Sequence, residues 1–389
     1  MKKTIKTEKL PIKLWLEDIE PGALKQVKNV ANLPFAFSHI AVMPDAHEGY
    51  GMPIGGVLAT HNVIIPNAVG VDIGCGMCAV RSSLRDVDPE VLKQIILTIR
   101  DVIPVGFRHH KKAQEETFMP VNHHVEDMKV IRREYLSARH QLGTLGGGNH
   151  FIELQRSEDG HLWVMIHSGS RNLGKQVADH YNRVAKQLNE KWSRVVDPKA
   201  DLAWMPLDIP EAADYLREMN YCVQFAFANR RRMMETVTEI ISDSVKGAVD
   251  FAPIINIAHN YAALEHHFGH KVMVHRKGAT SASEGETGII PGSQGTKSYI
   301  VEGLGNLESF MSCSHGAGRK MGRKQAQKQL DFHEEVRKLD DQGILHGIRN
   351  HHDLDEASGA YKDIDIVMAN QSDLVRIVTA LRPLAVVKG

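Results

Sequence analysis

Short apolar runs that end in glycine- or serine-rich turns recur along this chain, and several of the turns carry a histidine, an aspartate or a cysteine. Examples are "VGVDIGCGM", "LGGGNHFIEL", "LWVMIHSGS" and "NIAHNY". Apolar runs of this length, bounded by Gly, Pro and Ser, predict β-strands joined by turns. The 22 histidines and 32 glycines are concentrated in such clusters, which favours a metal or phosphate site assembled from loops.

Helices are expected in separate stretches of the chain. Residues 88–103 have helical apolar spacing, with Asp88 as the N-cap and Pro89 in the first turn. Further helices are expected in part of 107–140, at 174–194, at 211–247 and at 322–340, and residues 363–389 are expected to form a helix and then a strand. The segment 1–85 reads as short strands and turns. Strand clusters with segregated helices predict an α+β fold, and the absence of a composition break predicts a single domain, 1–389.

Bulk composition excludes some classes of protein and leaves others open. The 47 Lys and Arg residues balance the 47 Asp and Glu residues, so an anionic partner must be met by a local basic patch. No apolar run approaches the length of a membrane-spanning helix and no signal peptide is recognisable, so neither a membrane span nor export is expected. The four cysteines are too few and too scattered for a disulfide framework, which predicts a reducing, cytoplasmic location.

Five side chains at strand-to-turn junctions are candidate metal ligands. Asp72 and Cys75 lie close together on a glycine turn, and a carboxylate with a thiolate can bind a divalent transition metal. His150, His167 and His259 lie at comparable junctions. Each has an alternative interpretation: an inert buried cysteine, an exposed histidine on a flexible loop, or a histidine satisfied by ordinary hydrogen bonds.

A sixth junction, "SCSHGAGRK", places His315 among small residues, with Arg319 and Lys320 shortly after. Small neighbours leave the imidazole accessible, and glycine-rich turns allow backbone N–H groups to approach phosphates. Together with the candidate metal ligands, this inventory fits metal-assisted phosphoryl or nucleotidyl transfer. Neither GxxxxGK[ST] nor GxSxG is present, which argues against a P-loop enzyme and an α/β-hydrolase.

The motifs "MPDAHEGYG", "VGVDIGCGM", "LGTLGGGNHFIEL", "HSGSRNLG", "RKGA", "GIIPGS", "SHGAGR" and "YKDID" follow one another in an order that resembles the RtcB family of RNA ligases. The resemblance runs from about residue 10 to the last residue. It implies an RtcB-like fold of layered, mainly antiparallel β-sheets flanked by helices. It also implies joining of RNA 3′-phosphate or 2′,3′-cyclic phosphate ends to 5′-hydroxyl ends, in tRNA splicing or RNA repair.

The same resemblance implies two Mn(II) ions, GTP as cosubstrate, and specific roles for residues. His315 would form a covalent histidine–GMP intermediate, which passes GMP to the RNA 3′-phosphate. Arg319 would stabilise the developing charge, and Asp45 would support the site or act on the RNA end. Cys75 would bridge the two ions, with Asp72 and His150 on one and His167 and His259 on the other. The implied nucleotide contacts are Asn149, Phe151, Glu153, Ser293, His315, Gly316, Ala317, Gly318 and Lys362.

Departures from the family pattern leave alternatives open. Ser281 and Ser283 stand where an arginine is frequent, and the usual guanine-stacking aromatic is not evident. A divergent homologue that hydrolyses phosphates or only caps 3′ ends with GMP is therefore one alternative, and a non-catalytic RNA-binding homologue is another. The basic stretches 108–112, 229–234 and 318–328 are candidate RNA contacts or simply solvated helix faces. The resemblance also implies an archease-type activator as a further partner.

Overall fold

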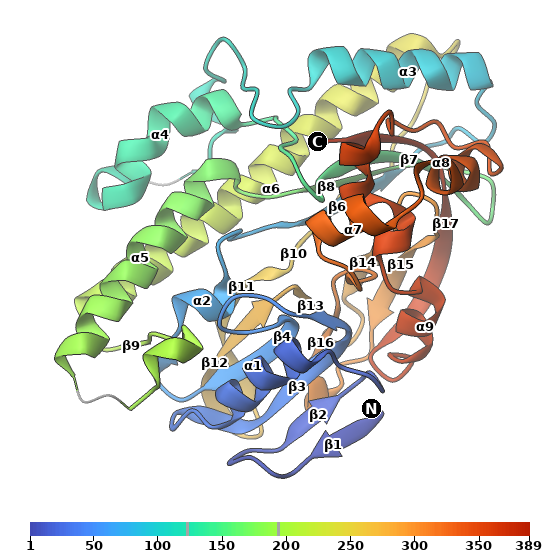
Figure 1. The fold of residues 1–389 in the computed structure, drawn as a ribbon. Helices are drawn as coiled ribbons and strands as arrows, with labels where there is room; N and C mark the ends of the chain where they lie inside the picture. Colours follow the sequence, from blue (N-terminus) through green and yellow to red (C-terminus); the bar gives the residue numbers. More distant parts are fainter. Residues whose placement is uncertain (122–123, 193–194) are drawn as a thin grey trace.

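Two β-sheets, one of six strands and one of seven, form the body of the protein (Figure 1). The computed structural model describes residues 1–121, 124–192 and 195–389. The first sheet has the order β1 (Lys3–Ile5), β2 (Ile12–Leu14), β3 (Ala36–His47), β4 (Ile54–Thr60), β12 (His270–Lys277), β11 (Asn260–His267). The second has the order β10 (Ile255–Ala258), β6 (Gly76–Arg81), β8 (Leu162–Ser168), β7 (Phe151–Ser157), β17 (Val375–Lys388), β15 (Ser298–Gly303), β14 (Thr287–Ile290).

Two short ladders join β13 (Ala279–Ser281) to β16 (Ser312–Ser314), and β5 (Val63–Ile64) to β9 (Met205–Pro206). Of the strand pairs formed by the described residues, β2 with β3 is parallel and the rest are antiparallel. The expectation of an α+β fold with mainly antiparallel sheets is therefore confirmed.

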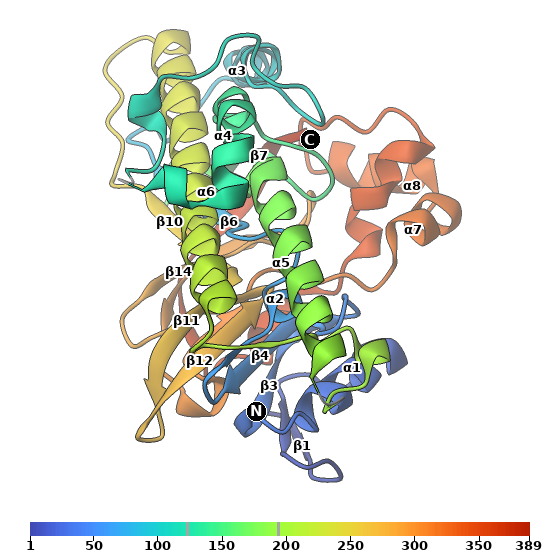
Figure 2. The ribbon, with the colours of Figure 1, turned by 90° about the vertical axis from the view of Figure 1, so that its left-hand side faces the viewer.

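Helices lie in groups outside the sheets rather than alternating with strands. They are α1 (Pro21–Ala31), α2 (Pro66–Val69), α3 (Pro89–Val102), α4 (Lys129–Gln141), α5 (Arg171–Lys191), α6 (Pro210–Ser244), α7 (Arg323–Gln329), α8 (Phe332–Asp340) and α9 (Ile364–Ala369). Helices α4, α5 and α6 lie side by side, and α7 and α8 are on another side of the molecule (Figure 2). Within the described ranges, no helix combines the length and the apolar character that crossing a bilayer requires.

The sequence of strand β8, "LWVMIHS", is mainly apolar and does not alternate with polar residues, because both faces of the strand are buried. Successive side chains of a strand point to opposite faces of the sheet. Val164 and Ile166 pack in a core with α3 and α6, whereas Trp163 and Met165 pack in a second core with residues of β6, β14 and β15. Both faces of β8 are buried, so both sets of positions are apolar.

The seven-stranded sheet is strongly curled. Its two edge strands, β10 and β14, approach each other, so the sheet is nearly a closed barrel. The core that contains Trp163 and Met165 fills its inside, and α3 and α6 cover its outside.

Three helix expectations need correction. The segment 1–85 is not all strands and turns, because 21–31 form α1, with Pro21 in its first turn and a buried face that includes Val27 and Val30. The helix expected at 322–340 is two helices, since Leu330 is extended and the Asp331 carboxylate accepts from the Glu334 N–H and starts α8. The helix expected at 174–194 begins earlier, at Arg171, and residues 193–194 lie outside the described residues.

Strand register brings the predicted metal ligands to one end of the seven-stranded sheet. Gly76 pairs with Ala258 on one side and Ser168 on the other, and Phe151 pairs with His167. The residues just outside these pairs are therefore neighbours in space although they are far apart in sequence. They include Cys75, His150 and His259.

A buried carboxylate ties three helices together, and its removal should destabilise the fold. Glu218 of α6 accepts hydrogen bonds from the Val130 and Ile131 N–H groups at the start of α4 and from the Tyr181 hydroxyl of α5. Glu218→Gln places an amide N–H₂ among these donors. We expect it to lower the free energy of unfolding by about 2 kcal/mol. Urea unfolding followed by circular dichroism measures the change, and Glu239→Gln, on the exposed face of α6, is the matched control.

Candidate active site

The five predicted metal donors form two groups that share one thiol. Cys75, His167 and His259 form one group, and Asp72, Cys75 and His150 form the other; in each group the ligand atoms all lie within 4.8 Å of one another. The Cys75 Sγ lies 3.3 Å from the His167 Nε2 and 3.5 Å from the His150 Nε2. A thiol flanked by imidazoles, with a carboxylate beside it, is a donor set suited to transition metals.

Backbone carbonyls fix the orientation of two of these rings. The His150 Nδ1 lies 2.9 Å from the Leu145 carbonyl oxygen, and the His167 Nδ1 lies 3.1 Å from that of Asn149. A carbonyl only accepts, so each Nδ1 carries the proton and each Nε2 presents its lone pair toward Cys75. Metal-bound histidines typically have this arrangement, in which the outer nitrogen is hydrogen-bonded.

The electrostatics of the group favour a cation. Burial is the main cause that lowers the pKa of His259, and the neighbouring His315 lowers it further. Burial and the nearby His150 likewise lower the pKa of His167. Both rings are therefore neutral. Burial raises the pKa of Cys75, and the Asp72 carboxylate raises it further. The buried His259 Nδ1 has no hydrogen-bond partner among the described residues. A bound divalent ion would engage such donors and draw the proton from the thiol, so the residues fit a metal.

Two adjacent side chains of α6 hold the turns that carry these donors. Arg230, fully buried, donates to the Gly74 carbonyl at 3.0 Å and the Ser168 carbonyl at 2.9 Å. Asn229, also fully buried, accepts from the Gly143 N–H at 2.7 Å and donates to the Gly169 carbonyl at 3.1 Å. These bonds support the turns before Cys75, after His167 and before His150.

The hypothesis that 229–234 forms an RNA-binding patch is therefore wrong for most of its residues. Asn229, Arg230, Met233 and Met234 are buried, and Arg231 alone is exposed. In the stretches 108–112 and 318–328, by contrast, most of the lysine and arginine residues are exposed.

His315 lies directly beside the metal-donor group. Its ring centroid is 4.8 Å from that of His259, and its Nδ1 is 2.6 Å from the Asp45 Oδ2. The same carboxylate oxygen accepts the backbone N–H groups of His315 and Gly316. Burial alone raises the pKa of Asp45, but the charge and hydrogen bond of His315 outweigh it and hold the pKa below its usual value. Asp45 thus stays ionised and keeps the proton of His315 on Nδ1.

This arrangement leaves the His315 Nε2 free, since no hydrogen bond of the described residues engages it. The chain around His315 is tightly fitted. Gly318 has a φ of +73°, and a Cβ there would overlap the Asp45 carbonyl oxygen, so this position requires glycine. A carboxylate that orients a histidine with a free outer nitrogen is a device for nucleophilic or acid–base chemistry.

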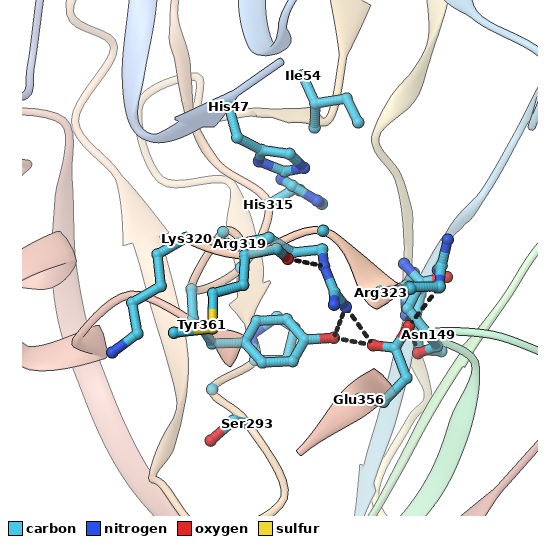
Figure 3. Close-up of a pocket in the computed structure, with 18 of the residues that line it drawn as sticks. His47, Ile54, Asn149, Ser293, His315, Arg319, Lys320, Arg323, Glu356 and Tyr361 are labelled. Carbon is cyan, nitrogen blue, oxygen red and sulfur yellow. Dashed lines mark hydrogen bonds and ion pairs between the residues drawn. The ribbon is translucent and has the colours of Figure 1, made fainter. Parts of the chain in front are cut away.

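His315 lines a cavity of about 700 Å³ (Figure 3), which His167 of the metal-donor group also lines. Most of the predicted nucleotide contacts also line it: Asn149, Phe151, Glu153, Ser293, His315, Gly316, Ala317 and Gly318. Asp45 lies behind His315. His47 was not among the predicted contacts, yet it lines the cavity beside His315, and burial lowers its pKa to about 4.

Arg319 also lines the cavity, but its guanidinium points toward Glu356 and Tyr361 (Figure 3). It donates to the Glu356 carboxylate at 2.8 Å and the Asp355 carbonyl at 2.6 Å, and it stacks on the Tyr361 ring. Arg323 bonds the other oxygen of Glu356 at 2.7 Å. Glu356, Tyr361 and Arg323 are cavity residues that sequence reasoning missed.

Lys362 occupies a different place from the one predicted. Its ammonium donates to the Pro44 and Ala46 carbonyls on either side of Asp45, and it is not among the residues that line the cavity. Lys388 does line the cavity; it pairs with Phe151 across β17 and β7 and lies over its ring. The short motifs carried no signal for it, because its place follows from the register of the last strand.

The fold and site define a class of protein: an α+β enzyme-like scaffold with a carboxylate-oriented histidine between a candidate metal centre and a cavity rich in glycine turns. Residues 26–389 match a family model described as tRNA-splicing ligase RtcB. An RNA-splicing ligase RtcB of Escherichia coli is 41% identical over 98% of each chain. The tRNA-splicing ligase RtcB of Pyrobaculum aerophilum is 33% identical over 98% of this chain and 95% of its own. That of Thermococcus kodakarensis is 32% identical over 94% of this chain and 91% of its own.

The chain therefore belongs to the RtcB family of RNA-splicing ligases. Its similarity to these relatives spans nearly the whole of both sequences, so the resemblance drawn from the motifs is confirmed.

Arg230 should control metal affinity without touching the metal. A lysine cannot reach the Gly74 and Ser168 carbonyls and Asn256 together, so Arg230→Lys should lower the affinity for Co(II), used as a spectroscopic probe, by about 10- to 100-fold. Titration followed by Co(II)–thiolate absorption measures the change. Arg231→Lys, one residue along and exposed, is the matched control. Equal affinities in the two variants contradict the role assigned to Arg230.

Proposed function

We propose that this protein joins an RNA 3′-phosphate or 2′,3′-cyclic phosphate end to a 5′-hydroxyl end, with GTP as cosubstrate and His315 as the nucleophile. The observation that carries the proposal is the Asp45–His315 pair, which leaves the His315 Nε2 free in the cavity. Family membership supports the class of reaction, and the four free cysteines fit a reducing cytoplasm.

In the first step the His315 Nε2 attacks the α-phosphorus of GTP. An N–P bond forms, the bond from phosphorus to the bridging oxygen breaks, and pyrophosphate leaves. The ring needs to lose no proton, because Asp45 keeps that proton on Nδ1 and its negative charge stabilises the cationic ring that results.

Two transfers complete the reaction. An oxygen of the RNA 3′-phosphate attacks the GMP phosphorus, and the His315 Nε2 leaves, which regenerates the histidine. The 5′-hydroxyl oxygen then attacks the RNA phosphate, GMP leaves with the bridging oxygen, and the hydroxyl proton passes to a base. His47, neutral and beside His315, is a candidate base for the proton of the 5′-hydroxyl. Where the RNA ends in a cyclic phosphate, water first opens that phosphate.

Asp72, Cys75, His150, His167 and His259 would hold two Mn(II) ions, with Cys75 shared. When bound, the ions would offset negative charge on the phosphates and orient them. The shared thiol supports a two-ion site. The thiolate and imidazole donors suit several first-row metals, so the choice of manganese rests on the family resemblance.

The part of the cavity lined by Glu153, Phe151 and Lys388 fits a guanine base. Burial raises the pKa of Glu153 to about 8, and a carboxylate there accepts from the N1–H and N2–H₂ of guanine, which adenine lacks. Phe151 and Tyr361 supply aromatic surface, Ser293 a hydroxyl and Lys388 a cation. We assign to Lys388 the guanine contact that the family resemblance implied for Lys362. Arg319, which stays paired with Glu356, would offset negative charge on the phosphates from the wall of the cavity.

Capping of 3′ ends without sealing is a second candidate function, favoured by one observation. Ser281, where an arginine is frequent in the family, donates to the Glu286 carboxylate and offers no positive charge. Incubation with GTP and RNA that has both end types separates the two: sealed product supports ligation, and accumulation of GMP-capped 3′ ends supports capping alone.

Guanylylation of His315 is the direct test. Wild-type protein incubated with manganese and GTP labelled at the α-phosphate should retain acid-labile label on a denaturing gel. His315→Ala should retain none, and Asp45→Asn should be slower by about a hundredfold or more because the ring loses its fixed tautomer. His333→Ala, an exposed histidine on α8, is the control. Label on the His315→Ala protein, or none on the wild type, contradicts the proposal.

Guanosine binding should strengthen as pH rises toward 8. Below that value the free Glu153 carboxyl is protonated, so binding of guanine N1–H costs the release of a proton, and the dissociation constant should fall about tenfold per pH unit. Above about pH 8 it should level off. Calorimetry with guanosine, which has no phosphate to titrate, measures this, and Glu153→Gln should remove the pH dependence. A steep pH dependence that survives in Glu153→Gln would assign the titration to another group.

A further inference from the structure

A second cavity, of about 390 Å³, adjoins the first across the end of β17. The two cavities share three lining residues, which are Gln294, Glu356 and Lys388. The second cavity also reaches Gly148, one residue before Asn149. It is therefore continuous with the candidate active site and lies outside the nucleotide contacts already described.

Three arginines line this second cavity: Arg100 from α3, Arg108 and Arg349. Among the described residues none of their guanidiniums has a carboxylate partner. Burial, and then the charge of Arg349, lowers the pKa of Arg100, so these two cations repel each other. Guanidiniums that line one cavity without a carboxylate partner are suited to a phosphate, which each can bind through two N–H groups.

The acidic side chains in the same cavity are already engaged or disfavoured as anions. Asp353 accepts the backbone N–H groups of Arg349 and Asn350, and Glu356 is held by Arg319 and Arg323. Burial, together with Glu356, raises the pKa of Asp355. The charge offered to a ligand is therefore mainly that of the arginines.

An exposed aromatic residue directly precedes one of these arginines, Arg108, in the chain. Phe107 is 99% exposed, whereas most phenylalanines are buried. Backbone hydrogen bonds hold the residues near it. The Gly106 N–H donates to the Gly146 carbonyl at 2.8 Å, and the Leu145 N–H donates to the Pro104 carbonyl at 3.0 Å. The backbone that carries the ring is thus tied to the glycine-rich loop that leads to Asn149 and His150.

We propose that Phe107 and the arginine-lined cavity together bind an unpaired segment of the RNA next to the ligation site. A base stacks on the Phe107 ring, and the adjoining phosphates enter the cavity between Arg100, Arg108 and Arg349. Exposed Lys111 and Lys112 extend the positive surface beyond Phe107. This inference rests on RNA being the substrate, and it names the surface that receives the strand.

The combination of groups favours a single strand of RNA over other partners. Stacking on an exposed ring requires a base that is free of pairing, and arginines beside an aromatic ring are the usual elements of single-strand binding. A protein partner would need a broader apolar surface than one isolated phenylalanine. Continuity with the cavity that contains His315 places the bound strand where its end can react.

The test is anisotropy of a labelled 12-nucleotide single-stranded RNA with a 3′-phosphate, at several salt concentrations and without GTP or metal. Phe107→Ala should weaken binding roughly tenfold at every salt concentration and leave the salt slope unchanged, because stacking displaces no counterions. Phe107→Trp should restore the affinity. Arg349→Gln should make the slope of log affinity against log salt shallower by about 0.7, as one lost phosphate contact requires.

Two matched controls accompany these variants. Leu264→Ala removes an apolar side chain that is 48% exposed on β11, and Arg85→Gln removes an exposed arginine away from the cavity; both should bind as the wild type does. Wild-type affinity in Phe107→Ala, failure of Phe107→Trp to restore binding, or an unchanged slope in Arg349→Gln each overturns the proposal. Since GTP is absent, the result is independent of whether His315 is guanylylated.

Discussion

The turns that carry the metal donors depend on two neighbouring polar side chains in the middle of α6. The carbonyl groups of Gly74, Ser168 and Gly169 lie at or next to strand ends, and the Gly143 N–H lies shortly after α4. Burial excludes water from these groups. Asn229 and Arg230 satisfy them. One helix therefore sets the relative positions of groups that come from three strands. The same requirement explains why an amide and a guanidinium persist inside an apolar helix core.

The candidate active site also depends on the contact between the two sheets. His259 follows β10 of the seven-stranded sheet and precedes β11 of the six-stranded sheet, so it lies where the chain crosses between them. Asp45, the partner of His315, comes from β3 of the six-stranded sheet. The remaining metal donors lie in or just before strands of the seven-stranded sheet. His315, bonded to Asp45 and packed on His259, joins the two contributions. His315 and the candidate metal donors are brought together only when both sheets are docked.

Much of this arrangement could be predicted from short motifs, because a polar residue on a glycine-rich turn beside an apolar run lies at or near a strand end. That reasoning located Asp72, Cys75, His150, His167, His259 and His315. It could not locate Lys388, whose place follows from pairing with Phe151, a residue of a strand far away in the sequence. Nor could it separate the buried Arg230 from the exposed Arg231, since adjacent letters of one kind give no information on which helix face is inside. Tyr361, an aromatic residue directly before Lys362, was identified only by its position in the cavity.

The curl of the seven-stranded sheet bears on aggregation. Because β10 and β14 approach each other, that sheet offers little free edge to a strand of another molecule. The six-stranded sheet ends in β1 and β11, each with one side unpaired in its own sheet. Intermolecular strand addition should therefore begin on the six-stranded sheet. The part of the molecule most exposed to misassembly is thus separate from the sheet whose strand ends carry most of the metal donors.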